Sequence, residues 1–214
     1  RGACPPTAAE RRVARRRWEL YDDQRALLMP GRISLQKHQL GLLLALDRLA
    51  RAGELPDQLV LLLPGRGRGA TVDRWVARIA GSPRLRAHVR LLGNQEDIRS
   101  LYWAADVLAL PSLWEGLPNA ALEGCACGLP ALLSRAANLD GIVEPGVTGW
   151  QVPTGDHRAV ARLIRDQVCH ASWPHLQEMG RLSRLRVERR FAPERILREV
   201  IETYDQLLAA APVR

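Results

Sequence analysis

Short apolar runs alternate along this chain with longer stretches in which apolar residues recur at helical spacing. The short runs are apolar at successive positions, which is typical of strands in a parallel sheet that is covered on both faces. Alternation of such strands with helices predicts right-handed crossovers and an α/β domain with a doubly wound, mostly parallel sheet. Strands are expected over residues 26–29, 59–63, 89–92, 107–110, 131–133 and 150–152. Helices are expected over residues 39–52, 72–80, 98–102, 118–127, 159–168, 173–190 and 193–210, after an Arg-rich amphipathic helix that precedes residue 25.

This arrangement directs attention to one edge of the sheet. Ligands of doubly wound sheets bind beyond the carboxyl ends of the strands. The loops that follow residues 29, 63, 92 and 110 are therefore the candidates for a binding site. The last two helices are expected to form a covering layer.

The loop after residue 110 carries two carboxylates, Glu115 and Glu123, in the segment PSLWEGLPNAALEG. A helix is expected to begin near Leu117, with Pro118 in its first turn, where the missing N–H costs nothing. Glu115 then lies just outside the helix N-terminus, where free amides and the helix dipole favour an anion such as a phosphate. A carboxylate beside an anion site can accept hydrogen bonds from hydroxyl groups. The segment is therefore a candidate nucleotide-sugar pocket.

Two cations, Arg32 and Lys37, follow the first predicted strand in the segment PGRISLQK. In a strand-to-helix loop such a pair can clamp a diphosphate, the arginine through a bidentate fork and the lysine as a point charge. Lys37 is the one lysine among 31 basic residues. A chain that otherwise uses arginine keeps lysine here, which favours a specific role over that of a surface charge.

The segment from Ala105 to Glu123, followed by CGLP at residues 127–130, resembles the Glu-x7-Glu signature of retaining glycosyltransferases of the glycosyltransferase-B fold. The resemblance runs from about residue 27 to the C-terminal helix. It implies a Rossmann-like domain that is the C-terminal, donor-binding half of such an enzyme, with the N-terminal acceptor domain missing from this chain.

The same resemblance divides the chain into three parts. Because the sequence opens on Arg1 rather than methionine, we interpret it as a fragment or an excised domain. The parts are an Arg-rich helical lead-in (1–25), a nucleotide-sugar donor-binding domain (26–190) and a C-terminal crossing helix (191–214).

The resemblance also implies roles by position. Arg32 and Lys37 would neutralise charge on the departing nucleoside diphosphate, and Glu115, the third catalytic residue, would contact the hydroxyls of the donor sugar. Glu123 would hold the ribose. The family usually has glycine after the lysine, whereas this chain has His38. The other positions implied to bind substrate are loop residues and backbone amides: Gly31, Gly93, Asn94, Gly116, Leu117, Asn119 and Ala120.

Other interpretations remain open from the sequence. A nucleotide-sugar epimerase has the same fold, which fold alone does not exclude. A dinucleotide-dependent oxidoreductase would rest on Gly65-x-Gly67-x-x-Ala70, but this follows the second strand and lacks an acid about 20 residues later, so a plain Gly-rich turn also explains it. Asn94 could equally cap the next short helix. A non-catalytic nucleotide-binding module is the last alternative.

Net charge is +8 at pH 7, almost all of it from arginine. The cluster Arg11, Arg12, Arg15, Arg16 and Arg17 falls at helical spacing and could meet an anionic membrane surface, although we favour a solvated helix face. Basic residues interleaved with stacking aromatic residues are absent, so no nucleic-acid partner is expected.

The four cysteines and five histidines show neither a disulfide framework nor the spacing of metal ligands. No metal or other cofactor is therefore expected. No stretch approaches the roughly 20 apolar residues of a membrane span. Together with the resemblance, these features predict a UDP-, GDP- or ADP-sugar donor and a glycan or lipid-linked acceptor. The expected location is cytoplasmic, with peripheral attachment to the inner membrane face as a possible extension.

Overall fold

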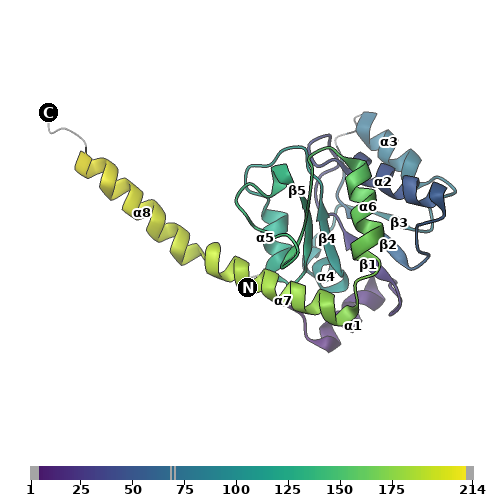
Figure 1. Cartoon of the computed structure of the whole chain (residues 1–214), viewed down its shortest axis with the longest axis horizontal. Helices are drawn as coiled ribbons and strands as arrows, with labels where there is room; N and C mark the ends of the chain where they lie inside the picture. Colours follow the sequence, from purple (N-terminus) through teal and green to yellow (C-terminus); the bar gives the residue numbers. More distant parts are fainter. Residues whose placement is uncertain (1–4, 68, 70, 211–214) are drawn as a thin grey trace.

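The structure, a computed structural model, describes residues 5–67, 69 and 71–210. Its centre is a six-stranded sheet in the order β3-β2-β1-β4-β5-β6 (Figure 1), and every pair of neighbouring strands is parallel. The strands are β1 (Arg25–Leu28), β2 (Leu59–Pro64), β3 (Val89–Gly93), β4 (Val107–Leu110), β5 (Ala131–Ser134) and β6 (Gly149–Val152). The helices are α1 (Ala8–Arg17), α2 (Gln39–Ala52), α3 (Thr71–Ala80), α4 (Ile98–Ala104), α5 (Asn119–Ala126), α6 (His157–Leu163), α7 (Trp173–Arg190) and α8 (Pro193–Ala210), with a 3₁₀ turn η1 (Arg135–Ala137) and a π-helical turn η2 (Ile164–Val168).

The strand order confirms the predicted doubly wound fold. The chain builds outward from β1 to β3, then returns to the other side of β1 and builds from β4 to β6. Because crossovers are right-handed, this reversal places the two sets of helices on opposite faces of the sheet. Helix α2 packs against α3 and α6, whereas α4 packs against α1 and α5 against α7. The reversal leaves a topological switch point between β1 and β4, where ligands of such sheets bind.

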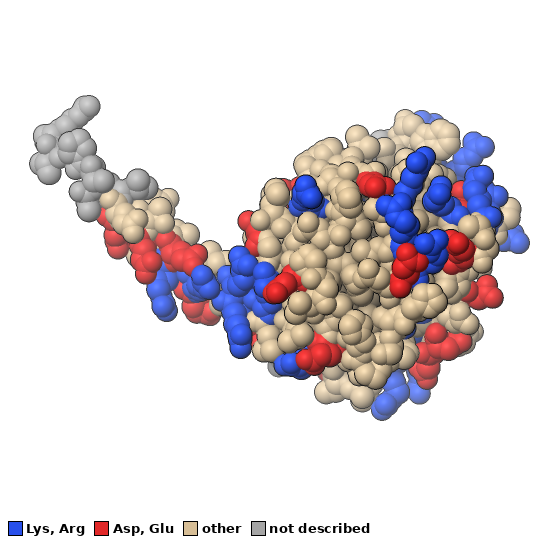
Figure 2. Space-filling view, viewed as in Figure 1, with Lys and Arg blue, Asp and Glu red and all other residues tan. Residues whose placement is uncertain are grey.

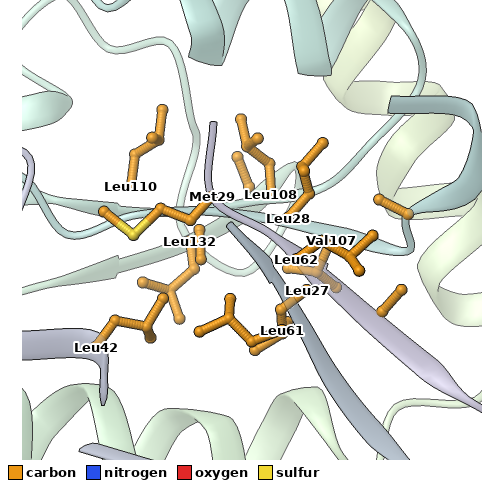
Figure 3. Packing of buried hydrophobic residues seen from close by; sticks show 14 of the residues in the cluster. Leu27, Leu28, Met29, Leu42, Leu61, Leu62, Val107, Leu108, Leu110 and Leu132 are labelled. Atoms are coloured by element: carbon orange, nitrogen blue, oxygen red, sulfur yellow. The ribbon is translucent and has the colours of Figure 1, made fainter. Parts of the chain in front are cut away.

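The core lies between the central strands and the helices. Leucine and valine side chains of β1, β2 and β4 interdigitate with Leu42 of α2 and Leu132 of β5 (Figure 3), and all of these residues are buried. Burial of one such side chain contributes about 1.5–3 kcal/mol to folding. The core therefore holds the strand ends, and the loops that leave them, in fixed positions.

Helix α1 is joined to the core by ion pairs. The guanidinium groups of Arg11 and Arg15 both reach the carboxylate of Asp106, whose other oxygen accepts a hydrogen bond from the Ala26 amide at 2.7 Å. The side chain of Asp106 is 0% exposed and that of Arg15 is 5% exposed. The expectation of a solvated arginine face is therefore wrong for Arg11 and Arg15, because the buried carboxylate requires a cationic partner. Arg12 and Arg16 are exposed, as expected.

The two C-terminal helices differ from each other. Helix α7 buries Leu176 and Met179 and packs against α5, as a covering helix should. Helix α8 instead projects away from the domain as a long arm (Figure 1), and Leu197, Ile201 and Tyr204 are exposed along it. The expectation of a covering layer is thus confirmed for α7 and wrong for α8.

Local differences from the prediction have simple causes. The helix expected over residues 159–168 begins at His157, where Asp156 caps it, and it changes to a π-helical turn at Ile164. Helix α5 begins at Asn119, so Pro118 precedes its first turn rather than lying in it.

Charges of both signs mix on the face of the molecule seen in Figure 2. Figure 2 shows basic and acidic side chains interleaved on the face that carries α2 and α6 and along α7 and α8. Several of these are ion pairs, such as Arg51–Asp47, Arg165–Glu54 and Arg195–Glu199. Among the residues that the structure describes, no helix combines the length and the apolar character needed to cross a bilayer.

Candidate functional site

Lys37 and Glu115 meet at the switch point. Lys37 lies in the loop after β1 and Glu115 in the loop after β4, and their Nζ and Oε1 atoms are 2.7 Å apart. The side chains are 20% and 6% exposed, respectively. The fold thus brings together two site residues that stand far apart in the sequence.

Glu115 is fixed on one side and open on the other. The Ser112 hydroxyl donates to the same Oε1 atom at 2.7 Å, and the Ser134 hydroxyl at the end of β5 holds the Ser112 carbonyl at 2.6 Å. Oε2 of Glu115 accepts no hydrogen bond from the part of the chain that the structure describes. That oxygen is therefore free to accept a hydroxyl from a ligand. Ser112 and Ser134 carried no sequence signal that distinguished them from ordinary loop serines.

The two loops are also joined through their backbones. The Leu113 amide donates to the Gln36 carbonyl at 2.8 Å, and the Gln36 side chain donates to the Trp114 carbonyl at 3.2 Å. Within the β1 loop, Gln39 donates to the Arg32 carbonyl at 3.0 Å and accepts from the Ser34 amide at 3.2 Å. Because Gln39 is buried, these bonds give the loop a defined shape. Sequence reasoning missed Gln39, because the sequence pattern shows it only as a polar residue at the start of a helix.

Arg32 is an exposed cation of the site. Its side chain is exposed and forms no ion pair or hydrogen bond within residues 5–67, 69 and 71–210. It lines a cavity of about 470 Å³ formed by the loops after β1, β2 and β3. Gly31 and Asn94 line the same cavity. An unpaired guanidinium on the wall of a cavity is suited to a phosphate oxygen.

Glycines allow these three loops to approach one another. A Cβ atom at Gly65 would stand 2.2 Å from the Gly31 carbonyl oxygen, and Gly65 donates to the Gly93 carbonyl at 2.6 Å. The interpretation of Asn94 as a helix cap is wrong, because Asp97 caps α4 through the Ser100 amide.

Glu123 occupies a different environment from Glu115. It is exposed on α5, and the buried Tyr102 hydroxyl donates to its Oε2 atom at 2.8 Å. Burial, and then the charge of Glu123, raises the pKa of Tyr102, so the phenol remains a donor. Oε1 of Glu123 has no hydrogen-bond partner in the described part of the chain. Tyr102 was not identified from the sequence.

The N-terminus of α5 also borders the site. The Asn119 amide donates to the Leu117 carbonyl at 2.9 Å. That bond leaves the amides of Gly116, Leu117 and Ala120 as candidates to face a ligand. The substrate-binding roles of all four residues stay predictions.

The Gly-rich turn after β2 has a local structural explanation. A Cβ atom at Gly67 would stand 1.6 Å from the carboxylate of Asp73, and that carboxylate accepts from the Gly69 amide at 2.8 Å. Ala70, the last position of the supposed dinucleotide fingerprint, lies outside the described residues. Close backbone packing therefore requires glycine at position 65, and glycine at position 67 leaves room for the Asp73 carboxylate, without a dinucleotide.

Metal ligands do not cluster in the described ranges. No group of three or more His, Cys, Asp or Glu side chains there is placed to hold an ion. Burial raises the pKa of the Cys125 thiol to about 11, which keeps it protonated and favours a packing role. That the protein needs no metal or cofactor stays a prediction.

Comparison with known proteins assigns most of the chain to one protein family. The model of the family "Glycosyl transferases group 1" matches residues 10–180. The chain is 29% identical over 144 residues to the UDP-Gal:alpha-D-GlcNAc-diphosphoundecaprenol alpha-1,3-galactosyltransferase of Escherichia coli, a match that covers 65% of this chain and 36% of that protein.

Solved structures agree with this placement. Sucrose-phosphate synthase from Thermosynechococcus elongatus is 29% identical, with a TM-score of 0.78 over 98% of this chain and 51% of that one. Anabaena Alr3699/HepE, solved in complex with UDP, shares the fold at 22% identity and a TM-score of 0.78, over 94% of this chain and 54% of its own. In these three comparisons the chain spans between 36% and 54% of the other protein.

Proposed function

Because this chain belongs to the group 1 glycosyl transferase family, we propose that it is the donor-binding half of a retaining glycosyltransferase. The enzyme transfers a sugar from a UDP-, GDP- or ADP-sugar to a glycan or a lipid-linked acceptor. HepE, whose structure contains UDP, and the undecaprenol-linked galactosyltransferase support the donor and acceptor classes. The matched galactosyltransferase is a transferase by name, and no observation favours the epimerase.

The observation that carries the proposal is the Lys37–Glu115 pair at the switch point, together with Arg32, which comes from the same loop as Lys37, lines the cavity between the loops after β1, β2 and β3, and has no partner among the described residues. As the bond from the sugar to the diphosphate breaks, negative charge grows on the leaving phosphate. Arg32 and Lys37 would neutralise this charge, which lowers the barrier. An ammonium group has three donors, so Lys37 can serve a phosphate and Glu115 together.

The two carboxylates would hold the two ends of the donor. The open Oε2 of Glu115 would accept a sugar hydroxyl, and the open Oε1 of Glu123 would accept a ribose hydroxyl. Gly31, Gly93 and Asn94 would contact the nucleoside. No metal is proposed, because the two cations serve the diphosphate.

The rest of the enzyme would complete the site. The exposed apolar residues of α8 would pack on an acceptor domain that precedes this chain, with residues 191–214 as the crossing segment and 1–25 as the lead-in to the donor domain. We further propose a cytoplasmic location with peripheral contact to anionic lipid through Arg12 and Arg16. Sedimentation with and without phosphatidylglycerol vesicles would test that contact.

Calorimetric titration of the 214-residue chain with UDP, GDP, ADP and NAD tests the proposal. One nucleoside diphosphate should bind, and Lys37→Ala should weaken it about 10- to 100-fold because a charge-assisted contact is lost. Glu123→Ala should weaken it about tenfold. The control Glu178→Ala, at an exposed ion pair on α7, should leave affinity unchanged. Selective NAD binding, or no binding across the panel, would overturn the proposal.

A further inference from the structure

His38 has a backbone conformation that glycine normally adopts. Its φ is 62° and its ψ is 36°, in the left-handed region, and it stands between Lys37 and the first residue of α2. A side chain in this conformation is strained relative to glycine. The conformation must therefore be held by contacts, and these contacts decide the direction in which the chain leaves Lys37.

The imidazole of His38 lies on the first turn of α2, over Gly41. A Cβ atom at Gly41 would stand 2.1 Å from the ring Cε1 and 2.4 Å from Nδ1, far closer than any van der Waals contact. The ring can therefore keep its place only while position 41 is glycine.

The same ring faces the loop that carries Glu115. Burial lowers the pKa of the imidazole, whereas the Pro111 carbonyl, just after β4, raises it as a hydrogen-bond acceptor does, so the ring lies near that loop. His38 thus contacts the helix start that follows Lys37 and lies near the loop that leads to Glu115. Gln36 and Leu113 join the same two loops a few residues away.

From this geometry we infer that His38 and Gly41 form a positioning pair that holds Lys37 against Glu115. His38 is a positioning residue, since it acts on the ligand through Lys37. The backbone of His38 turns the chain into α2, and the ring on Gly41 fixes that turn. The inference rests on the proposed function for its affinity readout.

A double-mutant cycle tests the pair. The ligand is the nucleoside diphosphate (UDP, GDP or ADP) that the unaltered chain binds. Gly41→Ala should push the ring off the helix and lower the affinity for this ligand about tenfold. His38→Gly keeps the left-handed turn without strain, and it should lower nucleotide affinity about threefold because the ring contacts are lost. In the double variant Gly41→Ala should add no further loss, since there is no ring to displace.

Thermal stability should show a reversal of sign. With His38 present, Gly41→Ala should lower Tm, because the added methyl group clashes with the ring. In the His38→Gly background the same change should raise Tm, since alanine favours a helix over glycine. Losses that add up in affinity and in Tm would overturn the inference.

His88 provides the matched control. It is also half-buried, and its Nδ1 is 2.9 Å from the Leu59 carbonyl at the opposite end of the sheet. His88→Ala should lower Tm without changing nucleotide affinity. If Gly41→Ala also lowered Tm without changing nucleotide affinity, His38 and Gly41 would be merely structural and the positioning role would be excluded.

Amide exchange separates a failure of this inference from a failure of the proposed function. If the unaltered chain binds no nucleotide, the proposed function falls, but the loops can still be compared. The Leu113 amide, bonded to the Gln36 carbonyl, should exchange faster in Gly41→Ala and return to the rate of His38→Gly in the double variant. Equal exchange in all four proteins would exclude the positioning pair.

Discussion

Strands β1 and β4 lie side by side, and a carboxylate with basic partners stands at each of their two ends. At the amino ends, Asp106 is completely buried, and both of its oxygens accept hydrogen bonds from Arg11, Arg15 and the Ala26 amide. At the carboxyl ends, Oε2 of Glu115 accepts no hydrogen bond from the described residues, and Arg32, which comes from the same loop as Lys37, has no partner among them. A carboxylate with cationic partners therefore makes a closed, structural cluster at one end and a cluster with unused hydrogen-bonding atoms at the other.

The largest effect is expected at the closed end. Asp106→Asn should lower the free energy of unfolding by about 3–5 kcal/mol, because it leaves the buried Arg15 guanidinium without its counter-charge. Chemical denaturation measures this loss. Glu178→Gln, at an exposed ion pair with Arg181, should cost less than about 1 kcal/mol. Similar losses in the two variants would remove the distinction between the closed cluster and surface ion pairs.

The open end should respond in binding rather than in stability. Glu115→Gln should lower the affinity for a nucleotide sugar about 10- to 100-fold. Its effect on the affinity for the matching nucleoside diphosphate should stay below about threefold. The reason is that Oε2 of Glu115 faces the sugar in the proposed complex. The ratio of the two dissociation constants is the measurement. A ratio that stays at the wild-type value would show that Glu115 does not recognise the sugar.

Changes around Glu123 are expected to lower nucleoside diphosphate affinity by less than Glu115→Gln lowers nucleotide-sugar affinity. Tyr102→Phe removes the hydrogen bond that orients Glu123 and should weaken the nucleoside diphosphate about threefold to tenfold. Tyr204→Phe, on the exposed arm α8, is the control and should leave affinity unchanged. Equal affinities for Tyr102→Phe and the unaltered chain would separate Glu123 from the nucleotide.

The smallest expected effect is a change in how the stability of the protein depends on pH. Burial, with His157 nearby, lowers the pKa of His38 below its ordinary value of 6.5. The unfolded chain therefore binds more protons than the folded one, so stability should fall as pH drops below about 6.5. His38→Asn, which tolerates the left-handed conformation, should make this slope shallower between about pH 7.5 and pH 5.5. An identical slope in the variant would assign the effect to other groups.

The sequence predicted the regular parts of the fold well. The bounds of α2, α7 and α8 are confirmed, because their apolar residues recur with helical period over three or more turns. Lys37 and Glu115 were both identified, since a cation or a carboxylate in the loop that follows a buried strand is conspicuous. Their contact was not predicted, because it depends on β1 and β4 being neighbours in the sheet.

Other features needed the structure for physical reasons. Asp106 follows Ala105 and precedes an apolar strand, so nothing local shows that arginines 91 and 95 positions earlier will reach it. The amphipathic pattern of α8 indicates a face that requires a partner, but not where that partner lies. The left-handed turn at His38 was hidden because histidine gives no local sign of it, although the family habit of glycine at that position pointed to a special conformation.

The Asp106 cluster also bears on how this polypeptide can be divided. Arg11 and Arg15 lie on α1, which precedes the first strand, yet they neutralise a carboxylate that is buried in the domain. A truncation that begins at Arg25 would keep every strand and every candidate ligand contact, but it would leave that buried carboxylate without its arginine partners. The shortest chain that folds independently should therefore include residues from Thr7 onward, whose side chain caps α1.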